Sequence, residues 1–459
     1  MGLALDNIGP LLKVPVIGKC AVRPGAGARV VIDSRRVRPG DAFFAIRGEK
    51  HDGHAFITPE LIRKTSYLLV SREWHALHRT PGTAVIAVED TILAMLKLCE
   101  AYLSSLKTRV VAVTGSNGKT TTRAMIARVL KRKYRVFETL GNFNNRIGLP
   151  LSVFGIDQSH DIAVLEMGAN HFNEIEELSN HVHPRFAVIT NVGRGHLEFF
   201  KNRQGVLRAK TEILAGMERG GILIVNADDG LLRRFRPAKG IRRVTFGFSA
   251  GADCRGRDLA IGLFSGTSFT LPSGREVRLA VPGKGAALNA MAALCAGRLF
   301  KVPEREAIRA LAETRGLHSR MEVRESRGAC FILDNYNANP DSLSNVLDLI
   351  RSEKKPLRKI AVLGDMGELG KGGTRLHREA GRKVCGCGFR MLLTLGRLGI
   401  ETVKGARSAG MKACFSFTDP AALLRAMQRE VRRGDLVLIK GSHSMEMEAL
   451  AETFLKGGK

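Results

Sequence analysis

A lysine and a threonine, Lys119 and Thr120, stand where a glycine-containing loop meets the start of a predicted helix. The β-branched apolar run over residues 109–114 predicts a strand, and Gly-Ser-Asn-Gly at 115–118 predicts a tight turn after it. The start of a helix after such a loop presents free backbone N–H groups and the positive end of the helix dipole, which together bind phosphate. Lys119 would then contact the outer phosphates of a nucleotide, and the Thr120 hydroxyl would hold a magnesium ion.

This loop is a shortened form of the general phosphate-binding pattern. The general pattern has a glycine five residues before Gly118, and this chain has Val113 there. The alternative is a Gly-Lys-Thr loop that binds no nucleotide. The predicted strand before the loop and the predicted helix after it favour nucleotide binding, and other parts of the chain have to decide between the two.

Further groups that suit metal ions follow other predicted strands. Glu166 ends an apolar strand, and His196 follows another. A carboxylate at the end of a buried strand must be paired or bound to a metal, because burying it alone is costly. Lys210 lies on an apolar helix face beside Glu212. His196 could instead belong to a turn, and Lys210 could be a structural lysine paired with Glu212 or Glu166.

The elements that would position these groups form three α/β regions. Residues 1–107 predict a small mixed α/β domain, 108–313 a parallel-sheet domain with the phosphate loop, and 314–459 an open, Rossmann-like α/β domain. Polar groups at strand ends fit such sheets, where sites gather at the carboxyl edge. Residues 287–300 predict an apolar helix, and residues 315–327 a hinge. The predicted strands are 28–32, 42–46, 67–70, 84–88, 109–114, 162–166, 186–190, 221–226, 330–333, 359–363, 391–395 and 436–440.

Composition indicates a soluble globular protein of several domains. The chain has 459 residues, of which 44% are hydrophobic and 25% charged. It has no apolar run of about 18 residues, so a membrane span is not expected. The first residues lack the basic start and unbroken apolar region of a signal peptide, which favours the cytoplasm. The eight cysteines are scattered and are expected to be reduced and mostly buried.

The formal net charge of +28 raises the possibility of nucleic-acid binding. The basic residues are spread along the chain, however, and one Trp with four Tyr gives little support for a base-stacking surface. We therefore expect a solvated basic surface, with part of the charge gathered around anionic substrates.

Taken together, the motifs TGSNGKTT, GNFNNRIGLP, LEMGAN, TNVGRGHLEFF, AKTEI, HSRME, DNYNANPDS, GDMGELG, LHREAG and KGS resemble the Mur ligase family over nearly the whole chain. These enzymes use ATP to form the amide bonds of the bacterial cell-wall peptide. Within the family, DNYNANPDS, GDMGELG and DSRRVRPGDAFFAIRGEKHDGHAF resemble the branch that adds D-alanyl-D-alanine to a UDP-N-acetylmuramoyl-tripeptide through an acyl phosphate. The resemblance implies that 1–107 binds the UDP substrate, 108–313 binds ATP, and 314–459 closes over ATP and binds the dipeptide. A monomer is expected for an enzyme that opens and closes in this way.

The resemblance also implies roles for individual residues. The nucleotide would be bound by Gly115, Asn117, Gly118, Lys119, Thr120, Thr121, Asn289, Arg320 and Asp334. Two magnesium ions would be held by Thr120, Glu166, His196 and a carbamylated Lys210, and Lys119, Lys210, Glu166 and His196 would be catalytic. The UDP substrate would be bound by Ser34, Arg35, Arg47 and Gly48, and by a loop with Asn142, Asn144 and Asn145. Asp365, Glu368 and His377 would lie near the incoming dipeptide.

Three positions depart from the family pattern. Gly285-Ala286 replace a His-Asn pair before the apolar helix, which bears on adenine recognition. Arg194 stands where glutamate or a small polar residue is common, and His443 where arginine is often found. The alternatives are the ligase that adds the third amino acid, folylpolyglutamate synthase, and a nucleotide-binding or nucleic-acid-binding protein that has lost catalysis. DNYNANPDS and GDMGELG argue against the first two, and the retained phosphate and metal positions against the third.

Overall fold

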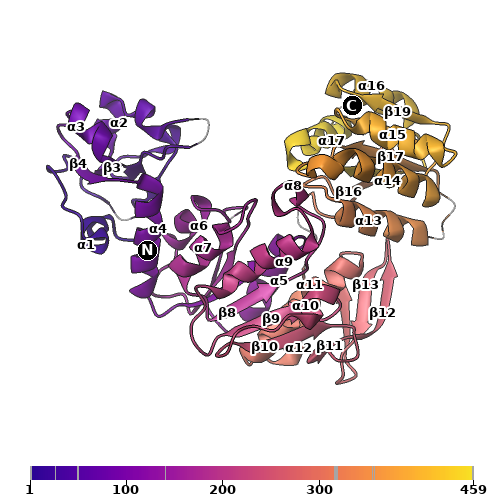
Figure 1. The fold of residues 1–459 in the computed structure, drawn as a ribbon, viewed down its shortest axis with the longest axis horizontal. Helices are drawn as coiled ribbons and strands as arrows, with labels where there is room; N and C mark the ends of the chain where they lie inside the picture. The colour runs from indigo at the N-terminus through magenta and orange to yellow at the C-terminus, as the bar shows by residue number, and fades with distance from the viewer. Residues whose placement is uncertain are drawn as a thin grey trace.

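The computed structural model describes residues 3–25, 27–48, 51–139, 141–314, 319–353, 355 and 357–456. Figure 1 shows three bodies in chain order, with the central body below and between the two end bodies. Each body contains a largely or wholly parallel sheet flanked by helices, so the predicted α/β class is confirmed. Of the predicted hinge, residues 315–318 lie outside the described residues.

The N-terminal body has a four-stranded parallel sheet in the order β1-β2-β3-β4. Its strands are short, apolar and mostly buried, which is why the sequence predicted them. A longer helix, α4 (Thr91–Ser104), starts at the Asp90 cap and leads toward the central body. The other elements are β1 (Val30–Val31), β2 (Ala42–Phe44), β3 (Tyr67–Ser71), β4 (Ala84–Val88), α1 (Ile8–Leu12), α2 (Pro59–Lys64) and α3 (Arg72–Leu77).

The central body has a seven-stranded parallel sheet in the order β11-β10-β9-β8-β5-β7-β6. Separate apolar clusters cover its two faces. The strands are β5 (Arg109–Thr114), β6 (Val136–Glu138), β7 (Ile162–Glu166), β8 (Phe186–Ile189), β9 (Ile222–Asn226), β10 (Arg242–Gly247) and β11 (Cys254–Arg255). The helices are α5 (Lys119–Leu130), α6 (Gly148–Val153), α7 (Glu174–Val182), α8 (Leu197–Phe200), α9 (Arg203–Thr211), α10 (Gly230–Arg234), α11 (Lys284–Leu299) and α12 (Glu304–Ala312).

Strand β5 lies between β7 and β8, so the carboxyl ends of these three strands meet at one edge of the central sheet. Those ends carry the phosphate loop, Glu166 and the segment leading to His196. Helix α11 is rich in alanine and packs closely against α5, the helix that follows the phosphate loop. The parallel topology therefore brings together groups that are far apart in the sequence.

A three-stranded antiparallel sheet extends from the central body beside the C-terminal one (Figure 1). It consists of β12 (Arg257–Gly262), β13 (Gly266–Thr270) and β14 (Glu276–Leu279). The sequence predicts no strands here, because these segments are short and partly polar: β14 alternates exposed and buried residues. The turn after β12 carries Leu263, which is buried in the apolar cluster of the C-terminal body.

The C-terminal body has a six-stranded sheet in the order β15-β16-β20-β17-β18-β19, parallel except for β15. Its strands are β15 (Glu322–Ser326), β16 (Ala329–Leu333), β17 (Lys359–Gly364), β18 (Met391–Leu395), β19 (Cys414–Phe417) and β20 (Leu436–Lys440). Its helices are α13 (Pro340–Ser352), α14 (Gly373–Gly386), α15 (Gly399–Ser408), α16 (Pro420–Glu430) and α17 (Met447–Lys456). Across the described parts of the chain, no helix has the length and apolar character needed to span a membrane.

Candidate active site

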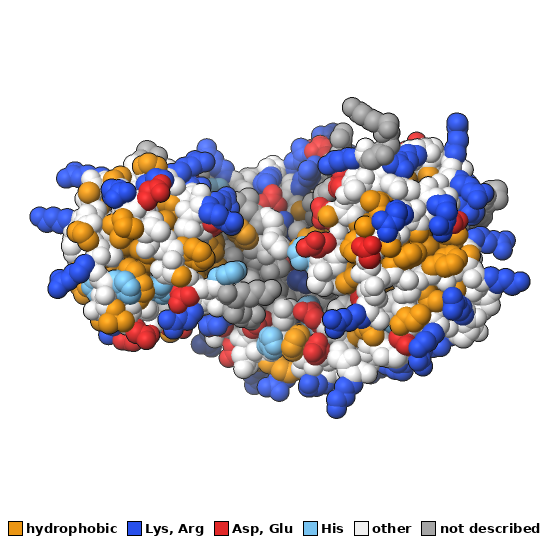
Figure 2. Space-filling view, turned by 90° about the horizontal axis from the view of Figure 1, so that it is seen from above, with side chains coloured by type: hydrophobic (Ala, Val, Ile, Leu, Met, Phe, Trp, Pro, Cys, Tyr) orange, Lys and Arg blue, Asp and Glu red, His pale blue; other side chains and the backbone are white. Residues whose placement is uncertain are grey.

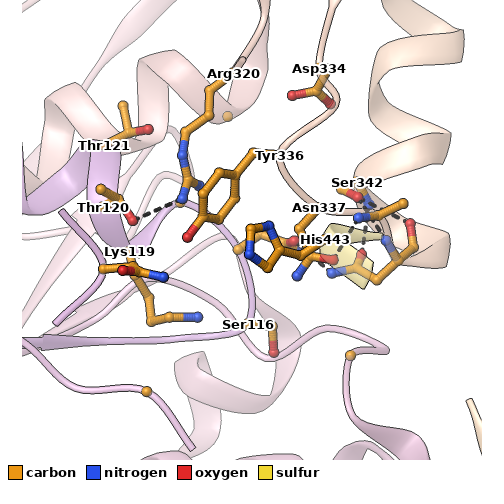
Figure 3. A pocket seen from close by; sticks show the side chains of 18 of the residues that line it. Ser116, Lys119, Thr120, Thr121, Arg320, Asp334, Tyr336, Asn337, Ser342 and His443 are labelled. Carbon is orange, nitrogen blue, oxygen red and sulfur yellow. Dashed lines mark hydrogen bonds between the residues drawn. The ribbon is translucent and has the colours of Figure 1, made fainter. Parts of the chain in front are cut away.

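A cavity of about 1610 Å³ lies where the central and C-terminal bodies face each other. The phosphate loop and the start of α5 form part of its wall, and residues of the C-terminal body form the opposite side (Figure 3). The cavity also reaches Arg47 and Gly48 of the N-terminal body. All three bodies therefore contribute to one site.

Two glycines of the phosphate loop lie too close to neighbouring side chains to carry a side chain of their own. Gly115 has φ 144°, and a Cβ there would stand 1.9 Å from Thr190 Oγ1. Gly118 has φ 78°, and its Cβ would stand 2.6 Å from Asn289 Oδ1. Both the left-handed backbone and the close approach therefore require glycine. Val113, at the position of the missing glycine, is a buried residue of β5.

The end of β8 holds the phosphate loop in place. The Asn117 carbonyl accepts hydrogen bonds from Thr190 Oγ1 at 2.7 Å and from Asn191 Nδ2 at 2.9 Å. The Asn117 N–H donates to Asn191 Oδ1 at 3.0 Å, and the Gly193 N–H donates to Ser116 Oγ at 2.9 Å. The loop is thus preorganised by a neighbouring strand rather than by its own sequence alone.

Lys119 and Thr120 face the cavity at the start of α5 (Figure 3). Lys119 Nζ donates to the Gly115 carbonyl at 2.9 Å, an interaction that a phosphate could replace. Burial lowers the pKa of Lys119, with Glu166 opposing the shift and Arg320 adding to it. The lowered pKa comes mainly from burial, and an anionic phosphate beside Nζ would oppose it.

Arg320 crosses from the C-terminal body to the phosphate loop. Its Nη2 donates to Thr120 Oγ1 at 3.1 Å, the contact drawn as a dashed line beside Thr120 in Figure 3. The guanidinium lies 3.9 Å from the centre of the Tyr336 ring, which orients it by a cation–π contact. Tyr336 in turn lies against the His443 ring, with the ring centres 5.3 Å apart.

Glu166 and Lys210 are buried, with exposed fractions of 2% and 1%, and each has an atom that makes no hydrogen bond to the described residues. Glu166 Oε1 accepts from Asn144 Nδ2 at 2.8 Å, but Oε2 has no donor. Lys210 Nζ likewise has no acceptor. Burial, with repulsion from Lys119, lowers the pKa of Lys210 to about 7. These atoms are costly to leave unpaired and point to ligands outside the chain.

The residues described contain no cluster of three or more His, Cys, Asp or Glu side chains able to hold a metal ion. His196 instead approaches the C-terminal body: its Nδ1 lies 2.5 Å from Glu368 Oε2. The hydrogen bond from His196 lowers the pKa of Glu368. The Glu198 N–H donates to the Glu368 carbonyl at 3.0 Å, so the GDMGELG loop is docked on the segment after β8.

Asp334 contacts its own body rather than the phosphate loop. Its Oδ2 lies 2.6 Å from Lys440 Nζ, and its Oδ1 accepts from the Met321 N–H at 3.2 Å. Lys440 is 2% exposed and also donates to the Asn337 carbonyl at 2.8 Å. This buried pair fixes the segment that carries Arg320.

The structure brings most of the predicted site residues to the cavity wall but leaves others outside it. Those that line the cavity are Asn117, Gly118, Lys119, Thr120, Thr121, Glu166, His196, Asn289, Arg320, Asp334, Arg47, Gly48, Asn142, Asn144, Asn145 and Glu368. Lys210 and Gly115 are not part of this wall. Asn289 contacts α5, where its Oδ1 accepts from Thr122 Oγ1 at 3.0 Å. Ser34 and Arg35 do not line the cavity, and Arg35 Nε bonds Asp33 at 2.9 Å.

Asp365 and His377 also lie outside the cavity. His377 is 2% exposed, and its two ring nitrogens lie 2.8 Å from the Gly373 carbonyl and 3.0 Å from the Met366 N. Asp365 Oδ2 accepts from the Leu398 N–H at 2.9 Å. His377 therefore supports the GDMGELG loop from beneath, and Asp365, a residue of that loop, ties it to Leu398. A sequence motif alone does not distinguish these roles from contact with a substrate.

The sequence analysis assigned no role to Tyr336, Asn339 or Asp341. Asn339 caps α13 in a reciprocal capping box with Ser342, and its Nδ2 donates to Asn117 Oδ1 at 2.7 Å. The Asn-Pro-x-Ser pattern could have predicted the cap. Nothing in the sequence could have indicated the contact with Asn117, which depends on how the two bodies dock.

Comparisons with known proteins match this architecture. Residues 113–297 match the Mur ligase middle domain, 319–443 the Mur ligase glutamate ligase domain, and 28–66 the Mur ligase family catalytic domain. The UDP-N-acetylmuramoyl-tripeptide–D-alanyl-D-alanine ligase of Bacillus subtilis (strain 168) is 36% identical over 431 residues, covering 93% of each chain. The chain belongs to the Mur ligase family.

Other Mur ligases agree in sequence and fold. The Escherichia coli (strain K12) enzyme of the same name is 31% identical, covering 94% of each chain. The crystal structure of MurF from Acinetobacter baumannii superposes with a TM-score of 0.86 at 28% identity, covering 99% of each chain. MurF ligase from Thermotoga maritima in complex with ADP gives a TM-score of 0.80 at 31% identity, covering 94% and 97%.

The three departures of this Mur ligase from the family pattern fall at different places. Gly285 and Ala286 line the cavity at the start of α11 and bring no polar side chain to it. His443 lines the cavity beside Tyr336. Arg194 lies outside the cavity and pairs with Asp341, with Nε 2.8 Å from Oδ1.

Proposed function

We propose that this Mur ligase uses ATP to join D-alanyl-D-alanine to a UDP-N-acetylmuramoyl-tripeptide in peptidoglycan precursor synthesis. The observation that carries the proposal is the single cavity in which Lys119 of the central body, Arg320 of the C-terminal body and Arg47 of the N-terminal body all take part. Such a cavity can hold a nucleotide phosphate, a carboxylate and an incoming amine together. Relatives with this name that cover more than nine-tenths of the chain support the choice of substrates.

The three bodies divide the binding work in this proposal. Residues 1–107 bind the UDP end, with Arg47 and Gly48 at the cavity rim. Residues 108–313 bind ATP through the loop at 115–121. Residues 314–459 close over the nucleotide and bind the dipeptide. A monomer fits a three-body enzyme that must open and close, and we place the reaction in the cytoplasm, where ATP is available.

The chemistry has two steps. A carboxylate is a poor electrophile, so the peptide carboxylate first attacks the γ-phosphorus of ATP and ADP leaves, which gives an acyl phosphate. The dipeptide amine then attacks the acyl carbon, and the tetrahedral intermediate expels phosphate with loss of a proton from nitrogen. Lys119 and the backbone N–H groups of the phosphate loop neutralise charge on the transferred group, and Arg320 adds charge from the opposite wall. Closing the bodies excludes water that would hydrolyse the acyl phosphate.

The residues present fit magnesium and a carbamate. Glu166 Oε2 and Lys210 Nζ are buried and make no hydrogen bond to the described residues, and Thr120, Glu166 and His196 line the same cavity. A pKa of about 7 leaves much of the Lys210 amine neutral near pH 7, as attack on carbon dioxide requires. Carbamylation would convert this amine, with release of a proton, into a carbamate whose two oxygens share one negative charge. Magnesium bound by these groups would supply charge neutralisation for phosphoryl transfer.

The net charge of +28 does not favour nucleic-acid binding as an alternative. Figure 2 shows Lys and Arg side chains distributed over the face in view and around its outline, with acidic residues among them, rather than gathered into one stripe. A nucleic-acid site needs a continuous basic surface. Lys119, Lys284 and Arg320 line the cavity, where the anionic substrates would bind.

Phosphate release from ATP tests the proposal. UDP-N-acetylmuramoyl-tripeptide and ATP are incubated with D-alanyl-D-alanine, with a single amino acid or, replacing the tripeptide, with a folate plus glutamate. We expect turnover only with the dipeptide and a new amide product by mass spectrometry. Turnover with a single amino acid or folate, or none with the dipeptide, would overturn the proposal.

A further inference from the structure

Arg194 and Asp341 join the central and C-terminal bodies at a point beside the cavity. The Arg194 N–H donates to Asp341 Oδ2 at 2.5 Å, and Arg194 Nε donates to Asp341 Oδ1 at 2.8 Å. The two residues are 147 positions apart in the sequence. Each carboxylate oxygen thus has its own donor from the same residue, an arrangement that fixes orientation as well as distance.

Both partners are presented on rigid backbone. Two backbone hydrogen bonds hold the segment just before Arg194. The Gly193 N–H donates to Ser116 Oγ and the Val192 N–H donates to Asp229 Oδ2, each at 2.9 Å. Asp341 lies in the first turn of α13, after an N-terminal capping box and Pro340. Because both segments are already ordered, forming this ion pair costs little conformational entropy. It therefore stabilises the contact more than a pair of mobile surface groups would.

The pair acts on the phosphate loop without lining the cavity. A Cβ on Gly193 would lie 2.7 Å from Asp341 Oδ2 and 3.3 Å from Ser116 Cβ, so the carboxylate packs against the segment that lies on the loop. The neighbouring Asn339 side chain bonds Asn117 of the loop directly. Neither Arg194 nor Asp341 is part of the cavity wall. The pair can therefore be removed without removing a group that faces ATP.

We propose that Arg194 and Asp341 are positioning residues that stabilise the closed arrangement of the C-terminal body on the phosphate loop. This inference rests on the proposed function only in taking the cavity as the ATP site. In this arrangement, Arg320 contacts Thr120 beside the loop and is oriented by Tyr336, so the closed form is the one with both cavity walls in place. Without the pair, open forms become populated, and the apparent affinity for nucleotide falls by the fraction that remains closed.

The test uses Arg194→Ala, Asp341→Asn and the double variant, with Arg185→Ala as the matched control. Arg185 forms an ion pair with Glu218 at 3.3 Å within the central body and joins no other body. Small-angle X-ray scattering of the free protein measures closure, and calorimetric titration with ADP and magnesium measures affinity. Arg194 and Asp341 are partly exposed, so we expect each single variant to enlarge the radius of gyration and to raise the Kd for ADP about fivefold.

A double-mutant cycle decides whether the two residues act as a unit. We expect the double variant to bind ADP no more weakly than either single variant, and Arg185→Ala to match the wild type. Additive losses, or scattering curves that do not differ from the wild type, would overturn the proposal. Thermal unfolding checks that each variant is folded. If Arg194→Ala does not fold, the test uses Asp341→Asn, which keeps the shape of the side chain.

These measurements do not require ligase turnover. If the double-mutant cycle shows that the two residues act as a unit but no dipeptide-dependent phosphate release is seen, the result counts against the proposed function alone. With the substrates present, we expect the variants to raise the KM for ATP while the kcat at saturation changes less than twofold, because saturating ATP restores closure.

Discussion

The two walls of the cavity differ in whether their buried charged groups have partners within the chain. The central body carries buried charged groups that lack hydrogen-bond partners: Glu166 Oε2 on the wall, and Lys210 Nζ, which does not line the cavity, make no hydrogen bond to the described residues. On the C-terminal wall, Asp334 and Lys440 satisfy each other, and His377 behind it has a partner at both ring nitrogens. Unpartnered buried groups store a cost that a ligand can relieve, whereas paired ones fix geometry. Variants of the first wall should lose turnover, and variants of the second should lose stability or affinity.

The largest expected effect is on the central wall. Lys119→Ala should lower kcat about a thousandfold, because it removes the cation nearest the transferred phosphoryl group. Lys131→Ala is the matched control at the other end of α5, where Lys131 pairs with Glu138 at 2.7 Å and is exposed. Steady-state phosphate release checks both variants. A Lys119 variant with near-normal kcat would remove the distinction between the two walls.

Lys210 comes next. Lys210→Ala should lower kcat about a hundredfold through loss of metal-binding oxygens, with unfolding stability kept or raised, because an unpaired buried amine is lost. Lys210→Arg retains a cation but cannot form a carbamate, so it should be equally inactive. Mass spectrometry under bicarbonate should show an added carboxyl group in the wild type alone. Full activity of either variant would refute the carbamate role.

On the C-terminal wall, Asp334→Asn should lower the free energy of unfolding by about 3 kcal/mol, because the buried Lys440 ammonium loses its counter-ion. Asp348→Asn is the matched control, since Asp348 lies 2.6 Å from Lys383 but is 55% exposed. Its loss should cost less than about 1 kcal/mol. Denaturant unfolding measures both. Equal losses of unfolding free energy in the two variants would show that burial does not make the Asp334–Lys440 pair more stabilising than an exposed pair.

Activity should also depend on pH through Lys210. Burial lowers its pKa to about 7, so the neutral amine that reacts with carbon dioxide predominates above that pH and the ammonium below it. Between pH 6 and pH 8 the neutral fraction rises about tenfold. Protein depleted of bicarbonate and then supplied with it should regain activity to a correspondingly greater extent at the higher pH. Recovery that does not change with pH would contradict the low pKa.

The smallest expected effect concerns Tyr336. Tyr336→Leu should raise the KM for ATP about fivefold, because Arg320 loses the ring that orients it. Tyr336→Phe keeps the ring and should behave as the wild type. Steady-state kinetics at varied ATP separates the two. Equal KM values for all three proteins would mean that Arg320 is positioned by other contacts.

The sequence predicted those parts of the fold that depend on local pattern. The strands that end at Thr114, Glu166 and Leu333 are apolar and buried, and the structure has strands in those places. The sheet β12–β14 was missed because its short strands are half exposed and give no continuous apolar signal. Its position beside the C-terminal body depends on tertiary packing.

The same limit applies to the site. Most residues assigned to the nucleotide line the cavity, because motif and strand-end position agree there. His377 and Asp365 belong to equally distinctive motifs, yet His377 is buried and Asp365 is bound to the backbone of Leu398, and neither lines the cavity. Arg194 was recognised only as an unusual residue. Its partner, Asp341, comes from another body, and no pattern within one segment specifies how two bodies dock.

The buried tip of the antiparallel sheet restricts how this chain can vary. Leu263 lies in the turn between β12 and β13, and its exposed fraction is 2% within the apolar cluster of the C-terminal body. Surface hairpin turns ordinarily tolerate insertions and deletions. This turn packs into the apolar core of the C-terminal body, so a change in its length would remove Leu263 from that core and leave a cavity there. The hairpin should accordingly be among the least length-variable loops of the chain, although it looks like a peripheral one.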